Sequence, residues 1–186
     1  DRSIGKKEGY TEGKTGVHKR HFINGETASY MGAKALLEAV SKAELDLSEL
    51  DCIVCASGTI EQPIPCTASL IQEQLSLSHL KIPCFDINST CLSFVVALDL
   101  MSYLISAGRY KNVAIVSTEI SSVGLNWEDE ESSMLFGDGA VAVIIGKSNK
   151  YKDSKIIASS IMTISEGAHY SEIYGGGTKL SPHEYS

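Results

Sequence analysis

The sequence predicts an α/β fold with a mixed, mostly parallel five-stranded sheet and helices on both of its faces. Two observations support this fold class. Short runs made almost only of apolar residues, such as Asp51–Ser57, have the pattern of strands that are buried on both sides. The segments between these runs carry apolar residues at helical spacing, and strands separated by helices are typical of βαβ crossovers.

The amino-terminal part begins with a loop and continues into a helix. Residues Asp1–His21 are rich in Gly, Lys and Glu and show little periodicity, which predicts a loop with at most a short helical turn. A helix is expected over Ala28–Ala43, where helical spacing follows the cap candidates Thr27 and Ser29. The strand Asp51–Ser57 follows it.

The central part continues the alternation of helices and strands. A second helix is expected over Thr67–Leu75 and a strand over Pro83–Ile87. The longest helical pattern is Cys91–Ala107, and Gly108 stands where a helix stop is expected. Further strands are expected over Asn112–Thr118, Ala140–Gly146 and Lys155–Ile164.

The last two predicted strands have no helix between them, so one edge of the sheet is expected to be antiparallel. We divide the chain into a first domain, residues 1–150, and a segment, residues 151–186, that holds the last strand and a linker. The tail, with Gly175–Gly177, has the composition of a loop.

The composition excludes several classes of partner. The 186 residues carry a formal charge of −7, and the basic residues are scattered except for a short run at Lys14–Arg20, so no nucleic-acid partner is predicted. No apolar run approaches the roughly 20 residues that cross a bilayer, and the first residues are polar. We therefore predict a soluble, cytoplasmic protein without a membrane partner.

The five cysteines favour a reducing compartment rather than a disulfide framework, because four of them lie in or beside apolar segments. Cys52 and Cys55 have the spacing of a metal or redox motif. They lie in a predicted strand, however, where residues three apart point to opposite faces, so we interpret them as core cysteines. The histidines have no metal-ligand spacing, and no metal is predicted.

Cys91 is the candidate nucleophile. It follows the polar turn Asn88–Thr90 at the junction between a strand and the longest helix. At a helix N-terminus, free N–H groups and the helix dipole stabilise a thiolate, and the backbone N–H of Cys91 could support an oxyanion. The alternative is a buried structural cysteine that packs against the start of the helix.

Several motifs, taken in order, resemble the β-ketoacyl-acyl carrier protein synthase III family of the thiolase superfamily. The segment Asp86–Phe94 (DINSTCLSF) resembles the active-site block of that family, and Phe136–Ala140 (FGDGA) resembles its glycine turn. Lys14–Val17, Pro65 and Gly175–Gly177 add to the likeness, which extends over nearly the whole chain. The resemblance implies the amino-terminal half of a thiolase-like enzyme.

The resemblance also implies an activity in fatty acid or polyketide biosynthesis. In that family the cysteine, here Cys91, takes an acyl group from a coenzyme A thioester. The acyl group then condenses with malonyl-acyl carrier protein, and CO2 is released. The family's histidine and asparagine belong to the carboxy-terminal half, so this chain alone is expected to be inactive in condensation.

The resemblance assigns further site residues. Tyr10 and Lys14 stand where the family has a tryptophan and an arginine that hold coenzyme A, which is a substrate here, so no cofactor is predicted. The acidic run Glu128–Glu131 stands where an arginine often completes that site, which leaves acyl carrier protein as an alternative donor. Ile64 and Phe94 are expected to line an acyl pocket.

The resemblance also implies that the segment Ile60–Pro65 contributes to a two-fold homodimer contact and to the wall of the acyl pocket. Two alternatives remain open for the function: a related synthase of the superfamily, of hydroxymethylglutaryl or polyketide type, and a non-catalytic, acyl-binding dimerisation partner.

Overall fold

The computed structural model describes residues 1–147, 156–173 and 175–180. The chain divides into two compact units, Asp1–Ser154 and Lys155–Ser186. Within the described residues, all α-helices and strands belong to the first unit. The predicted domain boundary after residue 150 falls in the segment 148–155, outside the described residues.

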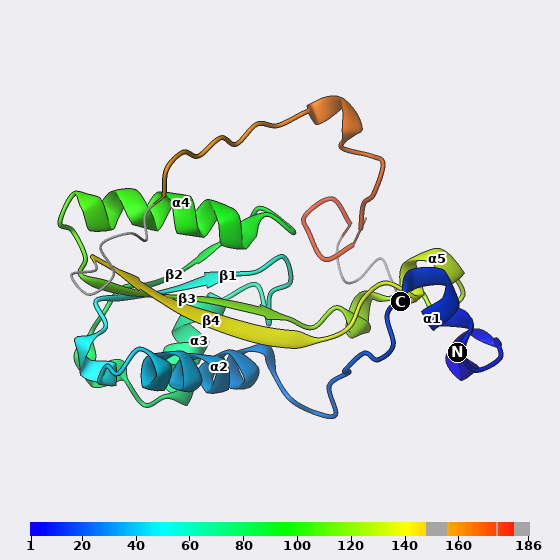
Figure 1. Ribbon diagram of the computed structural model, residues 1–186, viewed down its shortest axis with the longest axis horizontal. Helices are drawn as coiled ribbons and strands as arrows, with labels where there is room; N and C mark the ends of the chain where they lie inside the picture. The colour runs from blue at the N-terminus through cyan, green and yellow to red at the C-terminus, as the bar shows by residue number, and fades with distance from the viewer. Residues whose placement is uncertain (148–155, 174, 181–186) are drawn as a thin grey trace. The chain divides into compact units, whose positions relative to one another are not determined.

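A single mixed sheet forms the centre of the first unit (Figure 1). In the described residues it has four strands in the order β2-β1-β3-β4. Strand β1 pairs in parallel with both β2 and β3, and β4 pairs antiparallel with β3. The strands span Cys84–Ile87 (β2), Cys52–Ala56 (β1), Asn112–Glu119 (β3) and Gly139–Gly146 (β4).

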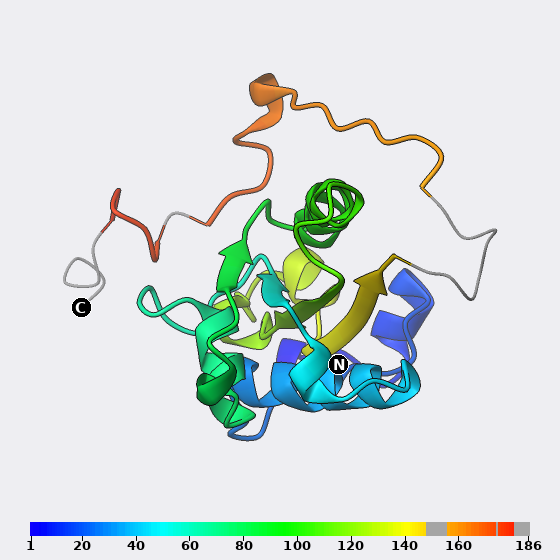
Figure 2. The ribbon, with the colours of Figure 1, turned by 90° about the vertical axis from the view of Figure 1, so that its left-hand side faces the viewer.

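Helices cover both faces of the sheet, as predicted. Helices α2 (Ala28–Lys42) and α3 (Thr67–Gln74) lie on one face, and α4 (Ser93–Ser106) lies on the other, as the end-on view in Figure 2 also shows. Because side chains alternate along a strand, β1 contributes to both layers. Ile53 and Cys55 pack with α2 and α3, whereas Val54 packs with α4.

The helix ends follow from local side-chain chemistry. The Thr27 hydroxyl accepts a hydrogen bond from the amide of Tyr30 and caps α2. Helix α4 ends at Ser106, and Gly108 follows the capping residue Ala107 with a φ of 77°, in the left-handed region that favours glycine. The amides of Gly108 and Arg109 satisfy two carbonyls of the last turn, at 3.0 and 2.9 Å.

The carboxylate of Asp86 in β2 caps helix α3. It accepts hydrogen bonds from the amides of Thr67 and Ala68, each at 2.8 Å. These two amides belong to the first turn of the helix and have no partner within it. Asp86 therefore ties β2 to the start of α3.

The predicted fifth strand is wrong. Residues 156–164 form no strand, and residue 155 lies outside the described residues. The apolar composition of this segment suits a strand, but a strand also requires a ladder of hydrogen bonds with a neighbour. The antiparallel edge is therefore formed by β4 against β3, and not by the two strands from which it was predicted.

Two short helices lie outside the three layers, α1 (Tyr10–Thr15) and α5 (Glu130–Ser133). Short 3-10 turns occur at Arg2–Ile4, Leu47–Glu49, Ser78–Leu80, Ser122–Gly124 and Ser165–Gly167. Among the described residues, no helix has both the length and the apolar character to cross a membrane.

Asp138 of the Phe136–Ala140 motif holds two remote loops together. Its carboxylate accepts hydrogen bonds from the amide and hydroxyl of Ser122, at 2.8 and 2.6 Å, and from the amide of Ile23, at 2.8 Å. Desolvation favours the neutral carboxyl, but these hydrogen bonds favour the carboxylate more strongly, so the pKa of Asp138 lies below its ordinary value. The motif is thus a structural anchor in this chain.

Replacing Asp138 with Asn is expected to lower the free energy of unfolding by about 1 to 3 kcal/mol at neutral pH, because bonds to a charged acceptor are lost. The folded-state pKa is depressed, so the stabilisation is present above the unfolded value of about 4 and is lost as the pH falls through the folded-state value. Urea denaturation of both proteins at about pH 7 and about pH 3 measures this. If the parent and Asp138→Asn differed in free energy of unfolding by the same amount at both pH values, the stabilisation would not come from the charged carboxylate of Asp138.

Candidate active site

The turn between β2 and α4 carries an exposed cysteine. Cys91 lies two residues before the first helical residue, Ser93, so the prediction that the helix starts at Cys91 is wrong. Thr90 has a φ of 54°, in the left-handed region, which interrupts the helical conformation before Cys91. The amides of Leu92 and Ser93 donate to the carbonyls of Ser89 and Thr90, both at 3.1 Å.

Two polar side chains stabilise this turn. The Ser93 hydroxyl accepts a hydrogen bond from the amide of Ser89, at 2.9 Å, and donates one to the carbonyl of Thr90, at 2.6 Å. The Asn88 side chain accepts a hydrogen bond from the amide of Thr90, at 2.9 Å. Sequence reasoning missed these roles, although Ser and Asn at the start of a helix are frequent capping and turn residues.

The five thiols differ in environment. Cys52 and Cys55 lie in β1 and pack into cores on opposite faces of the sheet, which confirms that they do not form a shared site. Burial raises the pKa of each to about 12 and that of Cys84 to about 11. Cys66 is partly buried, and Cys91 is exposed.

Tyr10 and Lys14 lie together on α1, as their helical spacing requires. The Lys14 ammonium is 5.8 Å from the centroid of the Tyr10 ring, and the Lys6 ammonium is 4.9 Å from it. The Tyr10 hydroxyl donates to Glu130, and the Lys6 ammonium is 2.7 Å from the same carboxylate. Hydrogen bonds from Lys6 and Tyr10 lower the pKa of Glu130. The acidic run therefore lies beside the two predicted substrate-binding residues.

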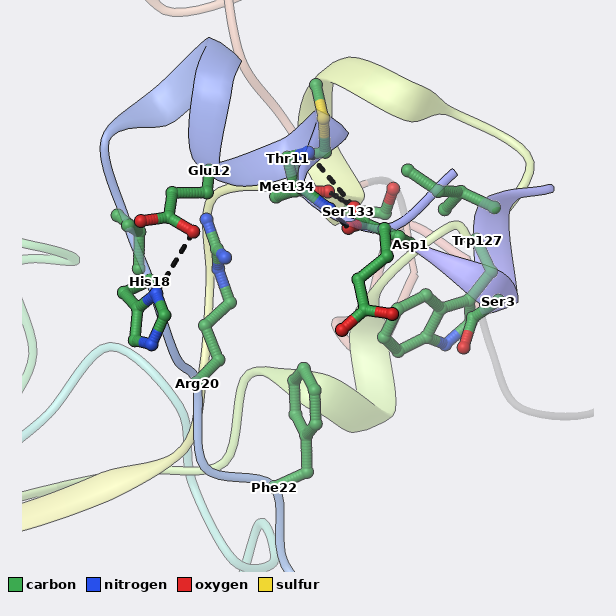
Figure 3. A pocket seen from close by; sticks show the side chains of 14 residues that line it. Asp1, Ser3, Thr11, Glu12, His18, Arg20, Phe22, Trp127, Ser133 and Met134 are labelled. Atoms are coloured by element: carbon green, nitrogen blue, oxygen red, sulfur yellow. Dashed lines mark hydrogen bonds and ion pairs between the residues drawn. The ribbon is translucent and has the colours of Figure 1, made fainter. Parts of the chain in front are cut away.

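A cavity of about 300 Å³ lies beside α1 (Figure 3). Thr11 and Glu12 of α1 line it, together with His18, Arg20 and Trp127. Glu12 pairs with His18 at 3.0 Å, and Arg20 extends next to this pair. None of the predicted site residues is among the lining side chains, so this cavity is separate from Cys91.

The two predicted acyl-pocket residues lie in different surroundings. Ile64 belongs to the loop between β1 and α3 and is 84% exposed. Phe94 lies in the first turn of α4 and packs against the core between α4 and the sheet. Their joint role in an acyl pocket stays a prediction. Among the described residues, no group of three or more His, Cys, Asp or Glu side chains has the arrangement of a metal site.

Comparison with known proteins shows which family the chain resembles. Residues 85–165, which contain both the Cys91 turn and the Phe136–Ala140 motif, match the model of the family 3-Oxoacyl-[acyl-carrier-protein (ACP)] synthase III. The chain is 42% identical over 141 residues to the β-ketoacyl-acyl carrier protein synthase III of Acholeplasma laidlawii, with 76% of this chain and 46% of the relative covered. Over these residues the chain is similar to the synthase III family.

Other relatives agree with this assignment. The synthase III of Aquifex aeolicus is 38% identical over 140 residues, with 75% of this chain and 45% of the relative covered. The crystal structure of the Aquifex aeolicus enzyme superposes with a TM-score of 0.73 at 36% identity over 78% of this chain and 46% of that one. The chain thus spans about half the length of the curated relatives it matches.

The solved structures also confirm the thiolase-like α/β fold. The synthase III of Pseudomonas aeruginosa matches 99% of this chain and 54% of that chain with a TM-score of 0.84, at 24% identity. A priming β-ketosynthase of the R1128 polyketide pathway matches 80% of this chain and 44% of that chain with a TM-score of 0.72, at 28% identity. The predicted resemblance to this family is therefore confirmed. The predicted sheet is corrected in two respects: it has four strands among the described residues instead of five, and its antiparallel pair is β3 with β4.

Cys91 is expected to be the most reactive of the five thiols, because it is exposed while burial suppresses ionisation of Cys52, Cys55 and Cys84. Limiting iodoacetamide followed by peptide mass spectrometry measures the modification of each cysteine. Labelling in about 6 M urea is the control, because unfolding exposes the buried cysteines and should make the labelling rates of all five thiols similar. Faster labelling of any other cysteine in the folded protein would argue against Cys91 as the nucleophile.

Proposed function

We propose that the chain is the nucleophile-bearing part of a condensing enzyme of fatty acid biosynthesis, with Cys91 as the acyl acceptor. The observation that carries the proposal is the exposed Cys91 thiol on a hydrogen-bonded turn immediately before α4. An accessible thiol at that position can both receive an acyl group and benefit from the positive end of the helix dipole.

The proposed reaction has two steps. In the first, the Cys91 thiol loses its proton, and the thiolate attacks the carbonyl carbon of an acyl thioester. The tetrahedral intermediate collapses with cleavage of the donor's C–S bond, and the donor leaves as a thiolate that takes up the proton lost by Cys91. In the second, malonyl-acyl carrier protein loses CO2, and the resulting carbanion attacks the acyl-Cys91 thioester. The thiolate of Cys91 leaves as the β-ketoacyl product forms. Covalent catalysis thus divides one difficult bond formation between two easier steps.

The proposal assigns partners and site residues. The printed names of the relatives contain the acyl carrier protein, which supports it as a partner here. Acyl-coenzyme A is the proposed donor, with Tyr10 and Lys14 as its contacts, and an acyl carrier protein remains the alternative because Glu130 lies beside them. The backbone N–H of Cys91 is the proposed oxyanion donor. No cofactor, nucleic acid or membrane is part of the proposal.

Two further features belong to the proposal. The exposed loop Ile60–Pro65 is proposed to contact a second copy in a homodimer, and Ile64 with Phe94 is proposed to limit the acyl chain. The protein is proposed to work in the cytoplasm. A polyketide priming synthase is the second candidate function, supported by the likeness to the R1128 priming β-ketosynthase.

Incubation of this chain with acetyl- and longer acyl-coenzyme A, or with acyl carrier protein thioesters, is expected to add one acyl group on Cys91. Intact-protein and peptide mass spectrometry measures the adduct, and Cys91→Ser should remove it whereas Cys66→Ser should not. With malonyl-acyl carrier protein added, this chain alone should form no β-ketoacyl product. Acylation that persists in Cys91→Ser would refute the proposed nucleophile.

Replacing Ile64 with Phe is expected to shift acylation toward shorter donors, because a phenyl ring fills more of an acyl pocket than a branched aliphatic side chain. A methylene-sized change in an apolar pocket alters selectivity by about 1 to 3 kcal/mol, so the shift should be graded. Competition between acetyl, isobutyryl and hexanoyl donors measures the preference. Ile157→Phe, at a position that is also exposed, is the control. An unchanged preference in Ile64→Phe would remove Ile64 from the pocket.

A further inference from the structure

Glu119, the last residue of β3, binds the loop that follows β1. Its carboxylate accepts hydrogen bonds from the amide of Gly58, at 2.7 Å, and from the amide of Thr59, at 2.9 Å. The Thr59 hydroxyl donates a third hydrogen bond to it, at 2.7 Å. A carboxylate that accepts three bonds from two consecutive residues fixes that loop relative to the sheet.

The same loop lies against the turn that carries Cys91. A Cβ atom added to Gly58 would lie 3.3 Å from the carbonyl carbon and 3.4 Å from the Cα of Thr90, so a larger residue there would require the turn to move by a few tenths of an ångström. The Gly58 carbonyl accepts a hydrogen bond from the Asn88 side chain, at 3.4 Å. Asn88 in turn accepts the amide of Thr90, at 2.9 Å.

These contacts form a continuous connection from Glu119 to the residue before the nucleophile. Thr90 is held in the left-handed region, at a φ of 54°, a conformation that is unfavourable for a non-glycine residue and persists only where the surroundings impose it. The loop Gly58–Thr59 supplies one side of those surroundings, and the hydroxyl of Ser93 supplies the other.

We propose that Glu119 is a positioning residue for the Cys91 thiol, acting through Gly58 and the turn Asn88–Thr90. The proposal rests on the proposed function of Cys91, and it adds a residue remote in sequence that sets where the sulfur lies. Glu119 does not contact the acyl group. It fixes the loop against which the nucleophile turn packs.

A purely electrostatic role makes the opposite prediction. The negative charge of Glu119 disfavours a nearby thiolate, so its removal by Glu119→Gln would accelerate reactions of Cys91 if charge were the main effect. A positioning role predicts slower reactions of Cys91. In Glu119→Gln the side-chain NH2 group replaces one carboxylate oxygen and faces a backbone N–H of Gly58 or Thr59, which cannot accept a hydrogen bond, so the loop must shift. The direction of the change therefore separates the two roles.

The chain offers a matched control at the opposite end of β3. The Asp51 carboxylate accepts hydrogen bonds from the amides of Lys111 and Asn112, at 2.6 and 2.9 Å. This contact has the same chemistry as that of Glu119 but does not involve the Cys91 turn. Asp51→Asn thus shows how far the loss of a carboxylate–loop contact at the sheet changes stability and Cys91 reactivity when the Cys91 turn is not involved.

The experiment uses the whole 186-residue chain with Glu119→Gln, Glu119→Asp and Asp51→Asn. For each protein, the rate constant for iodoacetamide alkylation of Cys91 and the single-turnover acylation by an acyl-coenzyme A are measured, with urea denaturation to record stability. Glu119→Gln should slow both reactions by on the order of 10- to 100-fold. The half-saturating donor concentration should stay within about twofold, because Glu119 does not bind the donor.

Glu119→Asp should recover part of the rate because it restores the carboxylate, and Asp51→Asn should leave the rates within about twofold of the parent. Thr59→Val removes the hydroxyl's hydrogen bonds to Glu119 and from the amide of Ile120 but keeps the carboxylate and its two backbone bonds. It should give a smaller loss, and it serves if Glu119→Gln does not fold. Unchanged or faster alkylation in Glu119→Gln, or an equal loss in Asp51→Asn, overturns the proposal. Alkylation of the parent at Cys91 without acylation would instead refute the proposed function, and the alkylation data would still test Glu119.

Discussion

Complete burial of strand β1 is the constraint on which the rest of the first unit depends. All five of its residues are at most 1% exposed, and they alternate between two cores. One core holds α2 and α3, and the other holds α4. Because β1 also pairs with strands on both sides, every layer is positioned relative to this one element. A charged residue in β1 would therefore be buried between two apolar cores at a large cost in free energy.

The turn that carries Cys91 is a consequence of this arrangement. Parallel strands β1, β2 and β3 end at the same edge of the sheet, and the loops that leave them meet there. This brings Gly58 from the first loop against Thr90 from the second, while Glu119 ends the third strand beside them. Residues that are remote in sequence thus meet beside the turn that carries Cys91, at the edge of the sheet where ligands usually bind in open α/β folds.

The sequence was sufficient where the determinants are local. Burial on both faces is visible in the composition of β1, and helical spacing is visible in α2 and α4, so their bounds were predicted to within about two residues. Helix α1, which brings Tyr10 and Lys14 together, was expected only as a short helical turn within a loop, so their proximity was not predicted. The start of α4 was misplaced because the left-handed Thr90 and the hydroxyl of Ser93 decide it, and neither has a periodic pattern.

The determinants that the sequence did not reveal are contacts between distant segments. The apolar segment 156–164 suits a strand in composition, but only the fold decides whether a neighbour is available to pair with it. Glu130 contacts Tyr10 across 120 positions, and Glu119 contacts Gly58 across 61. Pairing at such separations leaves no local pattern. The family resemblance placed the acidic run Glu128–Glu131 at the site of Tyr10 and Lys14, but nothing in the sequence indicated the contact of Glu119 with Gly58.

The cap that Asp86 forms on α3 changes how the motif around Cys91 is understood. Both oxygens of Asp86 are occupied by amides of that helix, so this acid contributes to architecture although it lies only five positions before Cys91. Loss of this cap would destabilise the start of α3, whereas a change at the exposed Cys91 would leave the cap in place. The stability of the fold and the chemistry of the exposed thiol are therefore separable within a single stretch of nine residues, Asp86–Phe94.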